Sequence, residues 1–131
     1  QGAVIFSELS PRPHDTGMVT LGHTLNLNEF ELHFRAVMGL PIPAIHLEHA
    51  GASAVVLGKE ETDDAPAYNM TDAVSEDYTR LRIFGKEHQL VGRRMGVVLC
   101  YGDKDDDTTP LRDKAKRLAA TVLGTDPYME K

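Results

Sequence analysis

Met95-Gly96-Val97-Val98-Leu99-Cys100-Tyr101 is the apolar run that decides how this chain of 131 residues folds. Short apolar runs that contain β-branched residues and end at polar or turn-forming residues are typical of strands. Two earlier segments, Ala52–Leu57 and Thr79–Phe84, have the same character. The sequence therefore predicts three strands between residues 52 and 101.

Two amphipathic helices are predicted, one before and one after these strands in the sequence. The first begins after Asn28, an N-cap residue, has a capping-box acid at Glu31 and ends at Gly39. The second is predicted from proline at 110 to residue 123, with Gly124 as its stop. Its apolar residues share one face: Leu111, Ala115, Leu118, Ala119 and Val122. Strands and helices together indicate an α/β fold.

A further strand is predicted at the start of the chain, where Val4-Ile5-Phe6 is apolar and β-branched. The strand cannot continue through Pro11–Gly17, because two prolines and a glycine interrupt the hydrogen-bonded ladder. We therefore expect an irregular polar loop there, in a position where binding residues are common. Leu40-Pro41-Ile42-Pro43 interrupts regular structure again and predicts a junction.

The charge of the chain excludes some classes of partner. Twenty acidic against fourteen basic residues give a formal net charge of −6, whereas binding to nucleic acid requires a basic surface. No run approaches the ~18 consecutive apolar residues of a membrane-spanning helix, and the start has no features of a secretory signal. We expect neither a nucleic-acid partner nor a membrane partner.

Two details indicate the compartment and the extent of the protein. Cys100 lies in an apolar run, where a thiol is usually a small buried side chain, and one cysteine forms no internal disulfide. A reducing, cytoplasmic location is therefore expected. The chain opens on Gln1 and not on methionine, so we expect it to be part of a longer protein.

Two oppositely charged segments form the candidate functional site. Glu8 follows the first predicted strand and Asp15 lies seven residues further on, so both carboxylates are expected to face one cleft. One later loop carries Lys86, Arg93 and Arg94. Carboxylates bind Mg²⁺ and guanidinium groups neutralise phosphate, so the two segments together predict phosphate chemistry. By spacing alone, solvated or capping acids and a solvated surface arginine pair stay open as alternatives.

Three other patterns carry less information. For His14, in the polar loop, we favour a role in the site over simple capping of the loop. His46-Leu47-Glu48-His49 lacks the His-Glu-x-x-His spacing of a metal site. Asp103–Asp107 has neither the central glycine nor the closing glutamate of a calcium loop. We expect no metal at these last two segments.

A family resemblance is carried first by Phe6-Ser7-Glu8-Leu9-Ser10-Pro11-Arg12-Pro13-His14-Asp15-Thr16-Gly17-Met18-Val19-Thr20. This string closely resembles the signature of the formate-dependent phosphoribosylglycinamide formyltransferases, which are ATP-grasp enzymes. Later blocks are similar to the family in the same order, from about Val4 to Ala120: Phe30–Pro41, Ala52–Leu57, Arg82–Lys86 and Arg93–Val97. A related carboxyaminoimidazole synthase shares Pro-Arg-Pro-His but typically continues with asparagine, so Asp15 favours the formyltransferase.

The resemblance implies a reaction in which ATP phosphorylates formate to formyl phosphate, which the amine of glycinamide ribonucleotide then captures. On the matching positions, Glu8 would bind Mg²⁺ and Asp15 would contact the glycinamide amine as the catalytic residue. The ribose phosphate would be held by Lys86, Arg93 and Arg94. ATP would be bound mainly by residues outside this chain, so the chain alone is expected to be inactive. The intact enzyme is expected to be a homodimer.

The resemblance also implies a domain organisation. Residues 1–43 would be the end of an ATP-grasp domain, with the metal and acceptor loop and a linking helix. Residues 44–131 would form a small strand-rich C-terminal domain, barrel-like with a rudimentary hybrid motif. Two alternatives stay open: another ATP-grasp carboxylate–amine ligase, such as a relative of carboxyaminoimidazole ribonucleotide synthase, and a non-catalytic anion-binding module.

Overall fold

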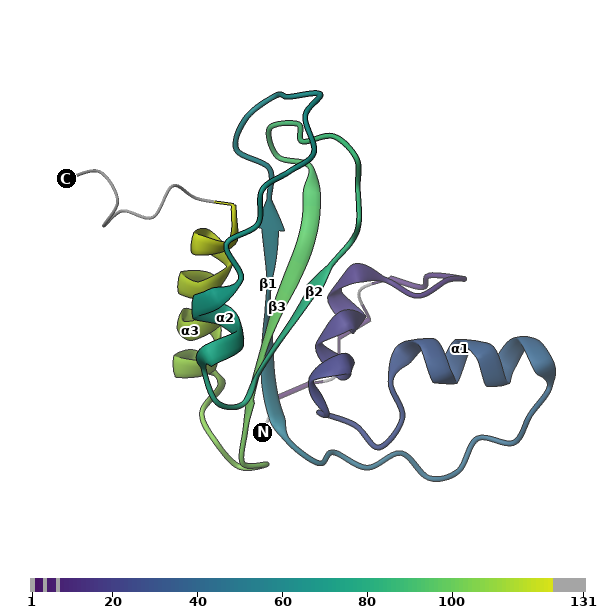
Figure 1. Cartoon of the computed structure of the whole chain (residues 1–131). Helices are drawn as coiled ribbons and strands as arrows, with labels where there is room; N and C mark the ends of the chain where they lie inside the picture. The colour runs from purple at the N-terminus through teal and green to yellow at the C-terminus, as the bar shows by residue number, and fades with distance from the viewer. Residues whose placement is uncertain (1, 4, 7, 124–131) are drawn as a thin grey trace.

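The computed structural model describes residues 2–3, 5–6 and 8–123, and in these residues the chain has the predicted α/β fold (Figure 1). Its three strands form one antiparallel sheet in the order β1-β3-β2. The elements follow one another as a 3-10 helix η1 (Asp15–Gly22), α1 (Glu29–Met38), β1 (Ala50–Leu57), α2 (Thr71–Ser75), β2 (Thr79–Ile83), β3 (Arg94–Gly102) and α3 (Thr108–Val122).

β3 is the central strand, and both of its faces are covered. Successive side chains of a strand point to opposite faces. Val98 and Cys100 belong to the core that α3 completes, whereas Leu99 lies on the other face, where a Cβ on Gly22 of η1 would lie 3.5 Å from it. Figure 1 shows α2 and α3 on one side of the sheet and η1 on the other. The uninterrupted apolar run therefore reflects burial on both sides.

Both predicted helices are present. The Asn28 side chain accepts hydrogen bonds from the backbone N–H groups of Phe30 and Glu31, and the Glu31 side chain accepts one from the backbone N–H of Asn28. Gly39 ends α1 with φ 63°. α3 begins at Thr108, two residues before the predicted proline, because the Asp107 carboxylate caps it through the Thr109 N–H. Four residues of the predicted apolar face of α3 are buried: Ala115, Leu118, Ala119 and Val122. The predicted stop, Gly124, lies outside the described residues.

Several predictions of local structure are wrong. Ile5 and Phe6 are not in a strand and are 84% and 81% exposed, while Val4 lies outside the described residues. A strand needs a partner, and no described segment pairs with these two residues. The predicted irregular loop ends at His14, because the chain from Asp15 onward forms η1. The short helix α2 was not predicted. The three described strands form an open sheet, so a barrel-like domain is not confirmed.

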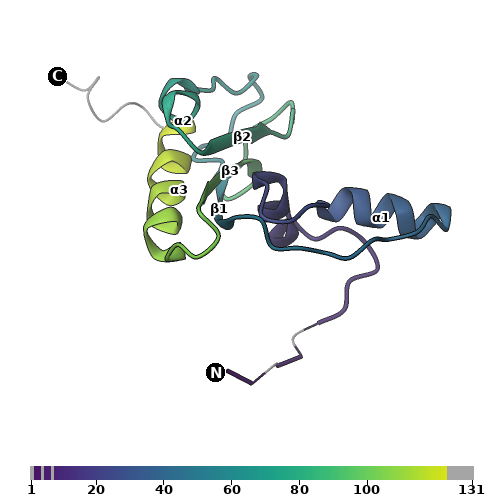
Figure 2. The same ribbon diagram turned by 90° about the horizontal axis from the view of Figure 1, so that it is seen from below.

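α1 extends away from the layered body (Figure 2), and none of its residues is buried. Four of its large apolar side chains are exposed: Phe30, Phe34, Val37 and Met38, with Phe34 at 58% and Val37 at 70%. Within the part of the chain that the structure describes, no helix is long and apolar enough to span a membrane.

Candidate functional site

A cavity of about 200 Å³ lies between η1 and the sheet. Its lining comes from four elements or their ends: Asp15, Thr16, Met18, Ser53, Val55, Phe84, Arg94 and Val97. Asp15 is the first residue of η1 and Arg94 is the first residue of β3, and their side chains form an ion pair. One residue from each of the two charged segments predicted from the sequence therefore lines this cavity.

His14 connects the remaining predicted acid to this site. One of its ring nitrogens, Nδ1, lies 2.9 Å from the Thr16 hydroxyl and 3.4 Å from an Asp15 carboxylate oxygen. The other nitrogen, Nε2, lies 3.5 Å from a carboxylate oxygen of Glu8. The Glu8 side chain is 67% exposed, so its carboxylate is available to a ligand that approaches from outside.

The cationic loop between β2 and β3 is braced from inside. Gln89 is only 4% exposed, and its side-chain oxygen accepts a hydrogen bond from the backbone of Lys59 at 2.8 Å. Gly92 has φ 75°, a left-handed conformation that glycine adopts without steric cost, and its N–H donates to Gly58 O at 2.9 Å. A brace of this kind limits the movement of the cations that the loop carries.

Two of the predicted cations do not line the cavity. The Arg93 guanidinium donates to the backbone oxygen of His88, at 3.0 Å, within its own loop. The ammonium group of Lys86 lies 6.0 Å from the centre of the Phe84 ring, and Phe84 itself lines the cavity. The structure thus brings Asp15 and Arg94 together and leaves Lys86 and Arg93 at the periphery.

The described residues fit a Mg²⁺ ion only as part of a shared site. None of them forms a group of three or more His, Cys, Asp and Glu side chains placed to hold a metal. Mg²⁺ is commonly bound through one or two carboxylates together with waters and substrate phosphates. An exposed carboxylate such as that of Glu8 is therefore suitable as a single ligand, with the remaining ligands coming from elsewhere.

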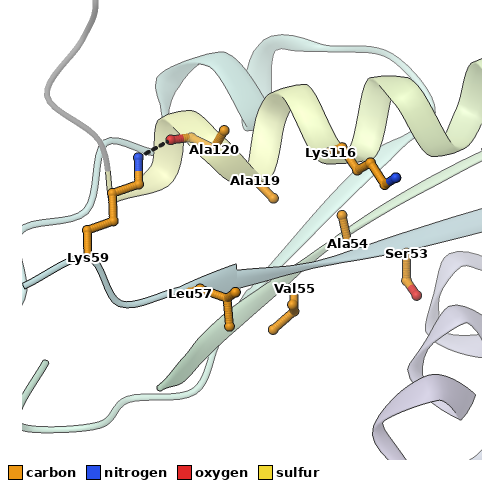
Figure 3. Close-up of a pocket in the computed structure, with 8 residues that line it drawn as sticks. All are labelled: Ser53, Ala54, Val55, Leu57, Lys59, Lys116, Ala119 and Ala120. Atoms are coloured by element: carbon orange, nitrogen blue, oxygen red, sulfur yellow. Dashed lines mark hydrogen bonds between the residues drawn. The ribbon is translucent and has the colours of Figure 1, made fainter. Parts of the chain in front are cut away.

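A second, larger cavity of about 460 Å³ lies between β1 and α3 (Figure 3). Ala54, which points toward α3, and Ala119 form part of its apolar lining, and Lys59 donates from its ammonium group to Ala120 O at 2.8 Å. No residue of the two charged segments lines this cavity. It adjoins the candidate site through Ser53 and Val55 of β1, which line both cavities.

Sequence reasoning did not find several residues of the site. Ser53 and Val55 lie within β1 and Phe84 follows β2, where such residue types read as ordinary strand residues. Only the packing of η1 against the sheet reveals that they line the cavity. The sequence did give a signal for Thr16, because this residue follows Asp15 in the polar segment.

Comparison with known proteins identifies relatives of this chain. The family described as "PurT, C-terminal" matches residues 51–122, more than half of the chain. The formate-dependent phosphoribosylglycinamide formyltransferases of Bacteroides fragilis and Bacteroides thetaiotaomicron are each 59% identical over 123 residues, which cover 93% of this chain and 32% of each relative. That of Chlorobaculum tepidum is 52% identical over 121 residues, covering 92% and 31%. The chain spans about a third of the length of these relatives.

Two solved structures have a similar fold. The N5-carboxyaminoimidazole ribonucleotide synthetase of Thermotoga maritima is 28% identical, with a TM-score of 0.75 over 86% of this chain and 31% of that protein. The phosphoribosylaminoimidazole carboxylase ATPase subunit of Aquifex aeolicus is 25% identical, with a TM-score of 0.66 over 87% and 32%. The family match and the relatives agree, and the chain belongs to the PurT C-terminal family.

Proposed function

We propose that this chain is the C-terminal third of an enzyme that formylates glycinamide ribonucleotide with formate and ATP in purine synthesis. The observation that carries the proposal is the ion pair of Asp15 and Arg94 across one cavity. The names of the relatives, formate-dependent phosphoribosylglycinamide formyltransferases, support the same reaction. In that reaction ATP phosphorylates formate, and the amine of the ribonucleotide captures the formyl group.

The acceptor in this proposal carries an amine at one end and a phosphate at the other. Asp15 accepts a hydrogen bond from the amine and orients it for attack, and Arg94 binds the phosphate through its forked donors. Without ligand the two side chains neutralise each other. Binding of the acceptor replaces their ion pair with one contact to each end of the ligand.

Lys86 and Arg93 complete the phosphate contacts in this proposal. Their loop is held to the segment after β1 by backbone hydrogen bonds, including Gly58 N to Arg93 O at 2.8 Å. Among the described residues, the Arg93 guanidinium is bound only by a backbone carbonyl of its own loop. A phosphate, which carries full negative charge, competes well against a neutral carbonyl for this guanidinium.

Glu8 is the proposed ligand of Mg²⁺ in this chain, and ATP is the proposed co-substrate. Bound Mg²⁺ offsets the negative charge of the nucleotide phosphates. The His14 ring lies between Glu8 and Asp15, so it links the proposed metal-binding carboxylate to the proposed acceptor-binding carboxylate. The ATP-binding residues are proposed to lie in the part of the enzyme that this chain does not contain.

The domain organisation is also a proposal. We assign residues 1–43 to the end of an ATP-grasp domain and residues 44–131 to a small C-terminal domain, whose barrel-like closure would require strands from outside this chain. The exposed apolar face of α1 and the unpaired Ile5 and Phe6 support an attachment to further structure. Burial of such a face is the usual source of helix stability.

The test is an enzyme in which this chain replaces the matching third of the Bacteroides fragilis relative; we call it the full-length enzyme. Formation of formylglycinamide ribonucleotide is measured with ATP and with or without formate. We expect product only when formate is present, and no ATP hydrolysis by the 131-residue chain alone. A well-folded full-length enzyme without formate-dependent product would contradict the proposal.

A second candidate function is favoured by one observation, the similarity to the synthetase of Thermotoga maritima. The alternative is a carboxylate–amine ligase that uses an acid other than formate. Measuring ADP release from the same enzyme separates the two functions, because bicarbonate in place of formate supports acceptor-dependent ATP consumption only under the alternative.

A further inference from the structure

We propose that Glu29 is a positioning residue of the acceptor site, whose carboxylate holds the turn that presents Asp15. The inference rests on the function proposed above. Glu29 is the first residue of α1, and its Oε2 accepts a hydrogen bond from the backbone N–H of His14 at 2.9 Å. His14 directly precedes Asp15, so this contact acts on the backbone next to the residue that binds the amine.

The carboxylate of Glu29 is turned inward at an energetic cost. Its second oxygen, Oε1, is buried, and no donor among the described residues reaches it. Burial of a polar atom without a hydrogen bond is unfavourable. An acid in the first turn of a helix already interacts favourably with the helix dipole when it is exposed. Helix stability therefore does not explain the inward orientation, whereas the contact to His14 does.

Gly17 provides the space that the carboxylate occupies. A Cβ atom at this position would overlap Oε2 of Glu29, and it would lie 2.7 Å from the carboxylate carbon. The N–H of Gly17 donates to His14 O at 2.9 Å, which closes a turn from 14 to 17. The missing side chain of Gly17 and the carboxylate of Glu29 thus fit each other.

A second link joins the same two elements. The Thr20 hydroxyl donates to Gly17 O at 2.7 Å and accepts from the backbone N–H of Glu29 at 3.0 Å. The backbone of Glu29 is therefore bonded to η1, and its side chain is bonded to His14, the residue that directly precedes η1. The turn that carries Asp15 is fixed against the start of α1 at two points, and a fixed backbone orients a functional side chain better than a mobile loop does.

The consequence concerns Asp15, which directly follows His14 in the chain. The His14 backbone is held by Glu29, and its ring lies between Glu8 and Asp15. Release of the His14 N–H lets the ring and Asp15 shift together. A misplacement of about 1 Å at a reacting group can lower the rate about a hundredfold.

The experiment measures steady-state kinetics of the full-length enzyme with Glu29→Ala and Glu29→Gln. For Glu29→Ala we expect a fall in kcat/KM for glycinamide ribonucleotide of about ten- to hundredfold, with the KM for ATP almost unchanged. Glu29→Gln keeps an oxygen that accepts from His14, so it should recover most of the loss. The matched control is Glu31→Ala on the same helical turn, which removes the capping box and should leave kcat/KM unchanged.

Glu29 is expected to act through Asp15, and a double-mutant cycle tests this. In an Asp15→Asn background, Glu29→Ala should have little further effect. If Glu29→Ala does not fold, Gly17→Ala displaces the carboxylate in place and should cause the same loss of kcat/KM. Wild-type kinetics in Glu29→Ala or Gly17→Ala, or additive effects in the cycle, would overturn the inference. An unmutated full-length enzyme without formate-dependent product would instead overturn the proposed function.

Discussion

Asp15 and Arg94 form an ion pair at a half-open position, where the arginine side chain is 59% exposed and the aspartate side chain is 32% exposed. Pairs of this kind contribute about 0–1 kcal/mol to stability, because water and salt screen them and the paired side chains lose conformational freedom. The fold therefore loses little if the pair opens. A ligand with a cationic end and an anionic end can therefore displace this ion pair at little cost to the stability of the fold.

Loss of the arginine should weaken acceptor binding. Arg94→Ala in the full-length enzyme removes a charge-assisted contact of about 1.5–3 kcal/mol, so the KM for glycinamide ribonucleotide should rise at least tenfold while the KM for ATP stays constant. Arg93→Ala should act in the same direction. The matched control is Arg112→Ala on α3, whose guanidinium pairs with the adjacent Asp113. An unchanged KM in both Arg93→Ala and Arg94→Ala would contradict their assignment to the phosphate.

Residue types marked Asp15 and Arg94 as candidates, because charged side chains on polar loops are visible in a sequence, and the family resemblance implied that both bind the acceptor. Neither signal pointed to Glu29. An acid at the first position of a helix reads as a favourable charge for the helix dipole. Its contact is to a backbone N–H fifteen positions away, and the turn that creates this contact has no signature of its own.

At the scale of elements, α2 is attached to α3 by a charged cluster. Glu76, which follows α2, accepts from Arg117 at 3.0 Å and lies 3.3 Å from the ammonium group of Lys114, both on α3. Hydrogen bonds from Arg117, and then from Lys114, lower the pKa of Glu76 below its usual value of about 4.5. The cluster holds a five-residue helix that is too short to be stable alone.

This cluster predicts a pH-dependent contribution to stability. Because the pKa of Glu76 is lowered on folding, its stabilising effect is complete above about pH 4.5 and is lost as the pH falls through the lowered value. The difference in Tm between the wild type and Glu76→Gln should therefore be constant from pH 7 to about pH 5 and shrink below that. Thermal unfolding followed by circular dichroism measures it, with Asp113→Asn as the control. The same difference in Tm at low and at neutral pH would contradict the role of the cluster.

The elements that the sequence predicted correctly are those with strong local signals. α1 has a complete capping box, α3 has an apolar face with helical period, and β3 has a continuous apolar run. α2 covers less than two helical turns, so no periodicity develops. η1 follows two prolines that read as a loop, and its packing against the sheet decides its conformation. The strand at Ile5 and Phe6 failed because a strand depends on partners that local residues do not supply.

At the scale of the molecule, the described chain consists of a layered body and an extension. α3 and η1 cover opposite faces of the sheet, whereas α1 lies outside these layers (Figures 1 and 2). The candidate site lies on the η1 side of the sheet, close to the helix whose apolar face is exposed. The exposed apolar face of α1 thus lies on the side of the sheet that bears the site (Figure 1).

The central claim is that the acidic and the cationic segments bind the two ends of one acceptor. A crystal structure of the full-length enzyme with glycinamide ribonucleotide tests this most directly. We predict the amine within hydrogen-bonding distance of the Asp15 carboxylate and the phosphate against Arg94, with Lys86 and Arg93 turned toward it and the ion pair of Asp15 and Arg94 opened. A ribonucleotide bound elsewhere, with that ion pair intact, would contradict the account.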